Sequence, residues 1–374
     1  MKTEGRKGRW IAGGVVLGLI LIVMVTTLTR RSTLISHAQR LPTGGEPYIW
    51  LSPQTVLVVR SGVKDDKNGG NTTSLSTLAR IELANGAESA LSASTAANYA
   101  SRPDLWRASP DGMWAAAEFT SYENSPPDNI LLWEIGGTRL YRWQAAWPRY
   151  SEQSTTLAEV VWLPDSRRFL VRASDKDRAY LFSVERPGGR GVPIPLPKGA
   201  KRLLGVLPDN RLVSSDFLSP KEALDAQANQ STAPGGTPAA PPPPPTTLEI
   251  HTLGLYPNSA PDSKTTLPLP ADMELHDLSL SPQGDRLLWV FSTTRPSGFG
   301  ALLTRFFPSL KNRFPPRTVV SLQISRLDGK DRHEIGYEDE NAGASDPLTY
   351  AHWSPDGKRI GFVVKNTLYA VPAD

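Results

Sequence analysis

The chain has 374 residues with 41 Lys and Arg, 37 Asp and Glu, and no cysteine, which excludes disulfides, thiol nucleophiles and Cys-ligated metals. Seven of the basic residues and one acidic residue fall within residues 1–40, so the remainder holds 34 basic against 36 acidic residues. The basic character therefore belongs to the N-terminal segment. The nearly neutral remainder lacks the basic patch that a nucleic-acid binder needs.

The first predicted element is a membrane anchor. Four Lys and Arg lie within residues 1–9, and residues 10–29 then carry no charge and are mostly Val, Leu, Ile and Gly. About twenty apolar residues span a bilayer as a helix. We therefore expect residues 1–9 to be a cytoplasmic tail, residues 10–29 a single transmembrane helix, and the rest extracytoplasmic, although the positive-inside rule gives only a small bias. The alternative is a cleaved secretory signal ending at Ser36-His37-Ala38, but such apolar regions have about 7–15 residues.

A turn motif then recurs along the chain, most clearly as Trp353-Ser354-Pro355-Asp356-Gly357 before the apolar run 360–364. In such a turn the Pro fixes φ near −65°, the Asp bonds its own backbone, and the Gly adopts the positive φ that closes a hairpin. The turn prolines are 44 to 74 residues apart, and a four-stranded propeller blade needs about 40–50. The turn residues of the six copies are Pro53; Pro110, Asp111 and Gly112; Pro164 and Asp165; Pro208 and Asp209; Pro282 and Gly284; Pro355, Asp356 and Gly357.

Further strands are predicted after each hairpin, for example at residues 130–133 and 140–141 in the second unit. The sixth unit stops at residues 367–371, after three strands. An incomplete last blade would leave an exposed sheet edge, which closed architectures remove. We therefore expect residues 33–37, just after the anchor, to supply the missing outer strand and close the ring.

The unit from Trp353 to Val363 resembles the TolB-like repeat, a WD-like family of six-bladed propellers in bacterial envelope proteins. The match is close at residues 353–363, fair at 109–119 and 281–291, and weak around 52, 164 and 208, where the Gly or Asp of the turn is missing. The resemblance implies an all-β, six-bladed propeller of four-stranded antiparallel blades over residues 30–374. It also implies that the turn residues are structural, and it supplies no active site.

Two insertions interrupt the repeats. The first, residues 218–247, contains five consecutive prolines at 241–245. Such composition cannot form a packed core and predicts a disordered or polyproline loop. It would act as a spacer or, alternatively, as a ligand for a proline-binding groove.

The second insertion, residues 295–318, has no acidic residue and combines cations with aromatic and aliphatic side chains. Its apolar residues recur at helical spacing over 301–310, which predicts a short amphipathic helix, shortened by Pro308. A cationic amphipathic helix suits a membrane surface or a partner groove; the alternative is that it folds back over the propeller. The candidate contact residues are Phe299, Leu302, Leu303, Arg305, Phe306, Phe307, Leu310, Lys311, Arg313 and Phe314.

No catalytic motif is present. The five histidines are scattered, and neither a His-Glu-x-x-His pattern, a Gly-x-Ser-x-Gly elbow nor a phosphate-binding glycine loop occurs. His352, on a predicted inner strand, is interpreted as structural. Residues 65–70 and 338–341 are acidic loops without the ligand spacing of a calcium site. We therefore expect no catalytic residue, metal or cofactor.

The sequence thus predicts a membrane-anchored, extracytoplasmic propeller that binds a protein partner or ligand without catalysis. The alternative is a hydrolase or lyase whose residues line the central channel, which no linear motif would reveal.

Overall fold

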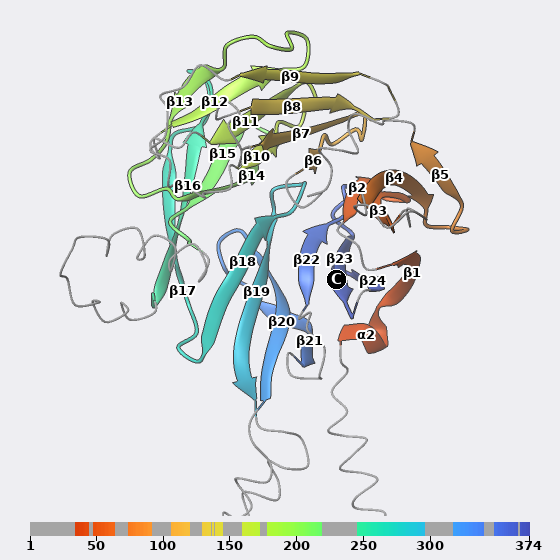
Figure 1. Cartoon of the computed structure of the whole chain (residues 1–374). Helices are drawn as coiled ribbons and strands as arrows, with labels where there is room; N and C mark the ends of the chain where they lie inside the picture. The colour runs from red at the N-terminus through yellow and green to blue at the C-terminus, as the bar shows by residue number, and fades with distance from the viewer. Residues whose placement is uncertain are drawn as a thin grey trace, which may run out of the picture.

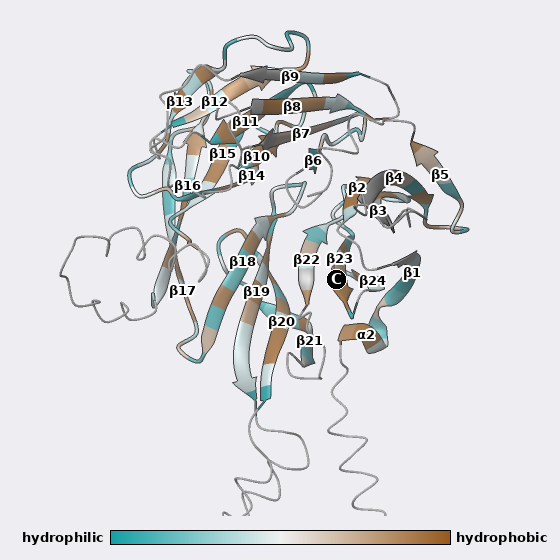
Figure 2. Ribbon diagram, in the orientation of Figure 1, coloured by the Kyte–Doolittle hydropathy of each residue, from teal (hydrophilic) through white to brown (hydrophobic). Residues whose placement is uncertain are grey.

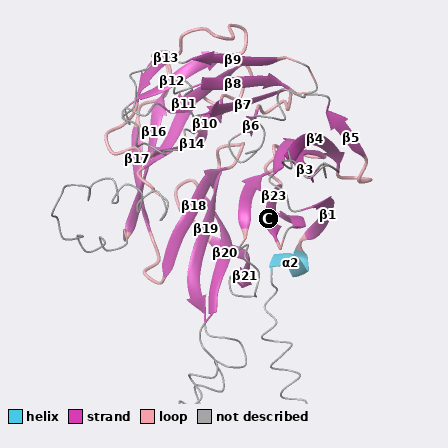
Figure 3. Ribbon diagram, viewed as in Figure 1, coloured by secondary structure: helices cyan, strands magenta, loops and turns pink. Residues whose placement is uncertain are grey.

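Six four-stranded antiparallel sheets make up the protein in the computed structural model (Figure 1). The sheets are arranged as the blades of a propeller, and the only helix among the described residues is α2 (Leu34–His37; Figure 3). The predicted six-bladed propeller of four-stranded antiparallel blades is therefore confirmed. The structure describes residues 34–44, 48–63, 74–91, 106–119, 129–135, 137, 139–144, 159–172, 178–218, 245–295, 317–339, 348–365 and 367–374.

In the first five blades the strands follow one another in sequence order from the centre outward. The first three blades are formed by β2 (Tyr48–Ser52), β3 (Thr55–Val63), β4 (Ser74–Glu82) and β5 (Glu88–Leu91); β6 (Arg107–Ala108), β7 (Trp114–Phe119), β8 (Asn129–Glu134) and β9 (Leu140–Gln144); and β10 (Val160–Trp162), β11 (Arg168–Arg172), β12 (Arg178–Ser183) and β13 (Val192–Pro195). The fourth and fifth are formed by β14 (Arg202–Val206), β15 (Arg211–Ser215), β16 (Thr247–Gly254) and β17 (Ser263–Pro268), and by β18 (Met273–Leu280), β19 (Arg286–Arg295), β20 (Arg317–Arg326) and β21 (His333–Asp339).

The sixth blade contains the two ends of the described chain. Its inner strands are β22 (Thr349–Trp353), β23 (Arg359–Val364) and β24 (Thr367–Pro372), and its outer strand is β1 (Gln39–Gly44) from the N-terminal side. Closure by an N-terminal strand is thus confirmed, but its position was predicted wrongly. Residues 34–37 form α2, and β1 begins at Gln39 and pairs antiparallel with β24.

The reason for the shift is the packing of α2. The side chain of Leu34 is fully buried against Val320, Leu322 and other residues between the fifth and sixth blades. The backbone N–H of Ile35 donates a hydrogen bond of 2.8 Å to the Glu338 carboxylate of β21. The apolar residues that indicated a strand therefore fill the gap between two blades instead.

The hydrophobic core lies between blades. Six clusters of buried residues occur, and each joins one pair of neighbouring blades around the ring. The brown segments of the strands in Figure 2 mark these positions. For example, Trp289 and Phe291 of the fifth blade stack at 5.7 Å and pack with residues of the fourth. Because every blade is covered on both faces, the ring must close to bury them all.

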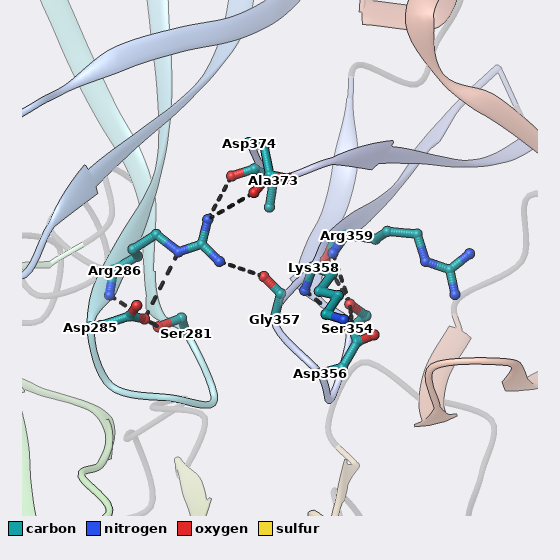
Figure 4. Close-up of polar contacts among 10 residues, drawn as sticks. All are labelled: Ser281, Asp285, Arg286, Ser354, Asp356, Gly357, Lys358, Arg359, Ala373 and Asp374. Carbon is teal, nitrogen blue, oxygen red and sulfur yellow. Dashed lines mark hydrogen bonds and ion pairs between the residues drawn. The ribbon is translucent and has the colours of Figure 1, made fainter.

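The repeated turns have the predicted conformation. Gly112, Gly284 and Gly357 adopt φ of 68°, 76° and 64°. In two of the three weak copies Ser166 and Asn210 occupy the same turn position with φ of 57° and 63°, so these turns form without glycine. Hydrogen bonds of 2.6 Å from the Ser354 hydroxyl to Asp356, and of 3.2 Å from the Lys358 N–H to Asp356, hold the sixth turn (Figure 4).

An arginine after some of these turns joins neighbouring blades. Arg286 donates hydrogen bonds of 2.7 Å to the Ala373 carbonyl and 2.8 Å to the Gly357 carbonyl, both in the sixth blade (Figure 4). Its guanidinium lies 5.3 Å from the ring of Trp353. Arg359 makes similar contacts with the first blade. It donates a hydrogen bond to the Pro53 carbonyl, and its guanidinium lies 5.4 Å from the ring of Trp50. The planar fork of arginine suits this combined role.

We expect Arg286→Lys to lower the free energy of unfolding by about 1–3 kcal/mol, because lysine keeps the charge but cannot bond both carbonyls. Urea denaturation of the full-length protein measures the change. Arg326→Lys is the matched control, since the Arg326 side chain is 63% exposed and its ion pair with Asp328 spans 3.8 Å. Equal effects of the two substitutions would contradict the role of Arg286.

The predicted anchor and both predicted insertions lie largely outside the described residues. Among the residues that are described, no helix combines the length and the apolar character that a membrane crossing requires. The first insertion connects β15 to β16, and the second connects β19 to β20.

Candidate binding site in the central cavity

The two faces of the propeller differ in their connections. Turns between first and second strands, and between third and fourth strands, lie on one face, and the longest of these has eight residues. The other connections join strand ends on the opposite face, here called the long-connection face. They include residues 64–73, 92–106, 145–159, 216–246 and 296–316. Functional residues concentrate on such loops, carried by a rigid scaffold.

A cavity of about 390 Å³ lies where the six inner strands converge. Residues from β2, β6, β10, β14, β18 and β22 all contribute to its wall, so it is the centre of the ring. Its lining is mixed, with apolar and polar parts side by side. The charged and titratable residues of the wall are Arg107, Glu159, Arg202, Asp277, Tyr48 and His352.

Three of these side chains form one ion-paired group across the third, fourth and fifth blades. The Nε of Arg202 lies 3.1 Å from Oε1 of Glu159, and its Nη2 lies 2.7 Å from Oδ1 of Asp277. We call Glu159, Arg202 and Asp277 the charged triad. Glu159 and Arg202 stand where β10 and β14 begin, which places them at the long-connection face.

The backbone fixes both carboxylates of the triad. Oε2 of Glu159 accepts a hydrogen bond of 2.5 Å from the Leu203 N–H, and Oδ1 of Asp277 accepts one of 2.8 Å from the Leu278 N–H. The pairing of β18 with β19 is irregular between Leu275 and Asp277.

Aromatic side chains form much of the remaining wall. Trp50, Trp106, Trp162 and Trp353 line the cavity, and the indole N–H of Trp162 donates a bond of 2.7 Å to the Arg107 carbonyl of the preceding blade. Burial raises the pKa of the Tyr48 phenol well above its ordinary value. The Tyr48 hydroxyl therefore stays protonated, with Tyr350 O 2.9 Å away as its acceptor.

The sequence-predicted residues do not gather at this site. The turn residues from Pro53 to Gly357 lie in the hairpins between first and second strands, and Pro110, Pro282 and Pro355 also touch the cavity. The candidate contact residues from Phe299 to Phe314 lie outside the described residues. His352 lies on an inner strand, as predicted, and lines the cavity.

The charged triad was missed. A charged residue at the start of a predicted inner strand is the signal that could have found Glu159 and Arg202, because that position faces the centre of a propeller. Within the described part of the chain, no three His, Asp or Glu side chains are grouped as metal ligands would be.

No protein-family model matches the chain, and no curated protein matches it in sequence. Solved structures with a similar fold include a TolB from Agrobacterium tumefaciens, with 14% identity, a TM-score of 0.43, and coverage of 88% of this chain and 90% of that one. The tricorn protease is 14% identical with a TM-score of 0.46, and the match covers 88% of this chain and 25% of the protease chain. The β-propeller domain of the Trilobed protease from Pyrococcus furiosus is 14% identical with a TM-score of 0.41, and the match covers 90% of this chain and 84% of that domain's chain. Identities this low carry no functional role over to this chain.

We expect Arg202→Met to lower the free energy of unfolding by about 1–3 kcal/mol, because it leaves two carboxylates facing each other in the cavity without their shared cation. Side-chain exposures of 19–32% keep the expected loss below that of a fully buried pair. Urea denaturation at low and high salt measures it. The control combines Arg202→Met with Glu159→Gln and Asp277→Asn, which should recover part of the loss. No recovery would contradict this account.

Proposed function

We propose that the protein is anchored in a bacterial membrane by residues 10–29, presents its propeller outside the cytoplasm, and binds a segment of a partner protein at the long-connection face without catalysing a reaction. One observation carries the proposal. The strand ends that border the long connections lie at the same end of the cavity as Glu159 and Arg202. A rigid ring with a polar and aromatic cavity suits the recognition of an extended segment.

The packing of α2 supports an uncleaved anchor over a cleaved signal. Cleavage after Ala38 would remove Leu34, whose side chain is fully buried between the fifth and sixth blades. A segment that completes the core is retained in the mature protein under this proposal. Mass spectrometry of the protein from its native membrane tests it: a chain that keeps residues 1–38 is expected, and a chain that begins at Gln39 would rule the anchor out.

The same geometry supports a membrane-facing or partner-facing role for residues 299–314. The end of β19 and the start of β20, which border the second insertion, lie at the same edge of the propeller as α2 (Figure 1). Leu34 packs against Val320, three residues beyond Arg317. The described residues that border the insertion therefore lie beside α2, the first described element after the predicted anchor. Deleting residues 297–315 should then reduce crosslinking to lipid or partner and leave the unfolding transition in place.

Site-specific crosslinking tests partner binding directly. A photoreactive residue at Ser279, which lines the cavity, is compared in native membranes with one at Met113, which is 53% exposed in the turn before β7 and outside the cavity lining. We expect crosslinks from Ser279 to map to one segment of one protein. Adducts that are no more abundant or specific than those from Met113 would refute binding at the cavity.

The enzymatic alternative has one observation in its favour, the convergence of Glu159, Arg202 and Asp277 with His352 at one cavity. A general acid or base must reach the reacting group with an available oxygen. Both oxygens of Glu159 and Oδ1 of Asp277 are instead engaged by Arg202 and by backbone N–H groups. This arrangement supports recognition over acid–base chemistry. Turnover that is lost in Asp277→Asn would reverse the choice.

A further inference from the structure

We propose that the charged triad selects a cationic side chain, a lysine or an arginine of the partner segment, and that Asp277 is the group that receives it. The inference rests on the proposed function, since it names the ligand chemistry of that same cavity. It begins from an imbalance: two carboxylates share one guanidinium, so the triad carries one negative charge in excess.

The imbalance is concentrated at Asp277. Both oxygens of Glu159 are engaged, Oε1 by Arg202 and Oε2 by the Leu203 N–H. Oδ1 of Asp277 takes both the Arg202 Nη2 and the Leu278 N–H. Its Oδ2 receives no hydrogen bond from any part of the chain that the structure describes. The Asp277 side chain is also the most exposed of the three, at 32% against 22% and 19%.

The surroundings favour a cation at this oxygen. Asp277 belongs to a cavity whose wall includes four tryptophans, and aromatic rings attract cations through their π faces. A charge-assisted hydrogen bond in a partly desolvated cavity is stronger than one in open water. A lysine or arginine of a bound segment would supply the missing donor.

Two other groups on the wall bear on this choice. Arg107 lies on the second blade, which is opposite the fifth blade in a ring of six, and its Nη1 donates to the Trp106 carbonyl at 3.0 Å. His352 lies on the sixth blade. Arg107 is therefore on the far wall of the cavity from Asp277.

The test uses a displayed library of random heptapeptides, panned on the full-length protein and on Asp277→Asn. The substitution keeps Oδ1 as an acceptor for Arg202 and Leu278 while it removes the negative charge. The matched control is Asp262→Asn, a carboxylate on the opposite face that accepts the Gly254 N–H at 3.0 Å. Urea denaturation shows whether each variant folds.

We expect peptides selected on the wild-type protein to share a lysine or arginine at one position. Their affinity should fall about tenfold on Asp277→Asn, about 1.4 kcal/mol, and stay unchanged on Asp262→Asn. The same fall should follow when that lysine is replaced by norleucine in the peptide. Peptides that bind at the cavity without a shared cation, or that bind Asp277→Asn equally well, would overturn the inference and leave the proposed function standing. A library that yields no peptide bound at the cavity would overturn both.

Discussion

Deletion of residues 34–44 should abolish the cooperative unfolding of the propeller. The deletion removes β1 from the edge of β24 and takes away two buried side chains, Leu34 and Leu41, which are 0% and 1% exposed. Each such leucine contributes about 2–5 kcal/mol when truncated to alanine. Loss of both and of a strand approaches the whole stability of a typical domain, about 5–15 kcal/mol. Urea denaturation followed by tryptophan fluorescence measures the loss.

The control for this deletion moves the strand instead of removing it. β24 ends at Pro372, and an antiparallel strand could follow it directly through a turn after Asp374. Residues 38–44 appended there through a short glycine linker should pair with β24 and restore a cooperative transition in the chain that lacks residues 34–44. The recovery should be partial, because Leu34 is still missing from the core. A deleted chain that unfolds as the intact protein does would show that the ring does not depend on this closure.

The turn chemistry explains why the propeller was predictable from sequence. A Pro, an Asp and a residue with positive φ specify a hairpin locally, without long-range contacts. The six copies of this motif therefore predict six hairpins. Where the turn glycine is replaced, as at Ser166 and Asn210, the backbone still adopts positive φ. The closing strand was misplaced because residues 34–37 are apolar enough for either a strand or a helix. Only packing against Val320 and Glu338 decides between them.

The charged triad could not be predicted in the same way. Glu159, Arg202 and Asp277 come from three blades and are more than 40 residues apart in the chain. Their contact depends on how three inner strands are placed around one axis, including the irregular pairing near Asp277. A single charged residue in a strand indicates a solvated position when it is read alone. Tertiary structure turns three such residues into one site.

Replacing Gly112 by alanine should cost about 2–5 kcal/mol, more than the same substitution at Gly199. Both glycines have positive φ, 68° and 90°, so alanine brings a backbone strain of about 1–2 kcal/mol at either site. At Gly112 a Cβ would also lie 2.0 Å from the Leu51 carbonyl oxygen of the neighbouring blade, whereas at Gly199 no atom lies within 4 Å. Overpacking of this kind adds about 1–3 kcal/mol.

Gly199→Ala is therefore the matched control, and urea denaturation of both variants gives the difference between them. Positive φ alone is tolerated in this fold, since Ser166 and Asn210 adopt it at the turn position that Gly112 occupies. The additional loss of unfolding free energy at Gly112 comes from moving the second blade away from the backbone of the first. Equal losses for the two variants would mean that the first and second blades are not held in fixed contact at this turn. A larger loss at Gly112 would show that the repeated turn serves as an inter-blade contact as well as a hairpin.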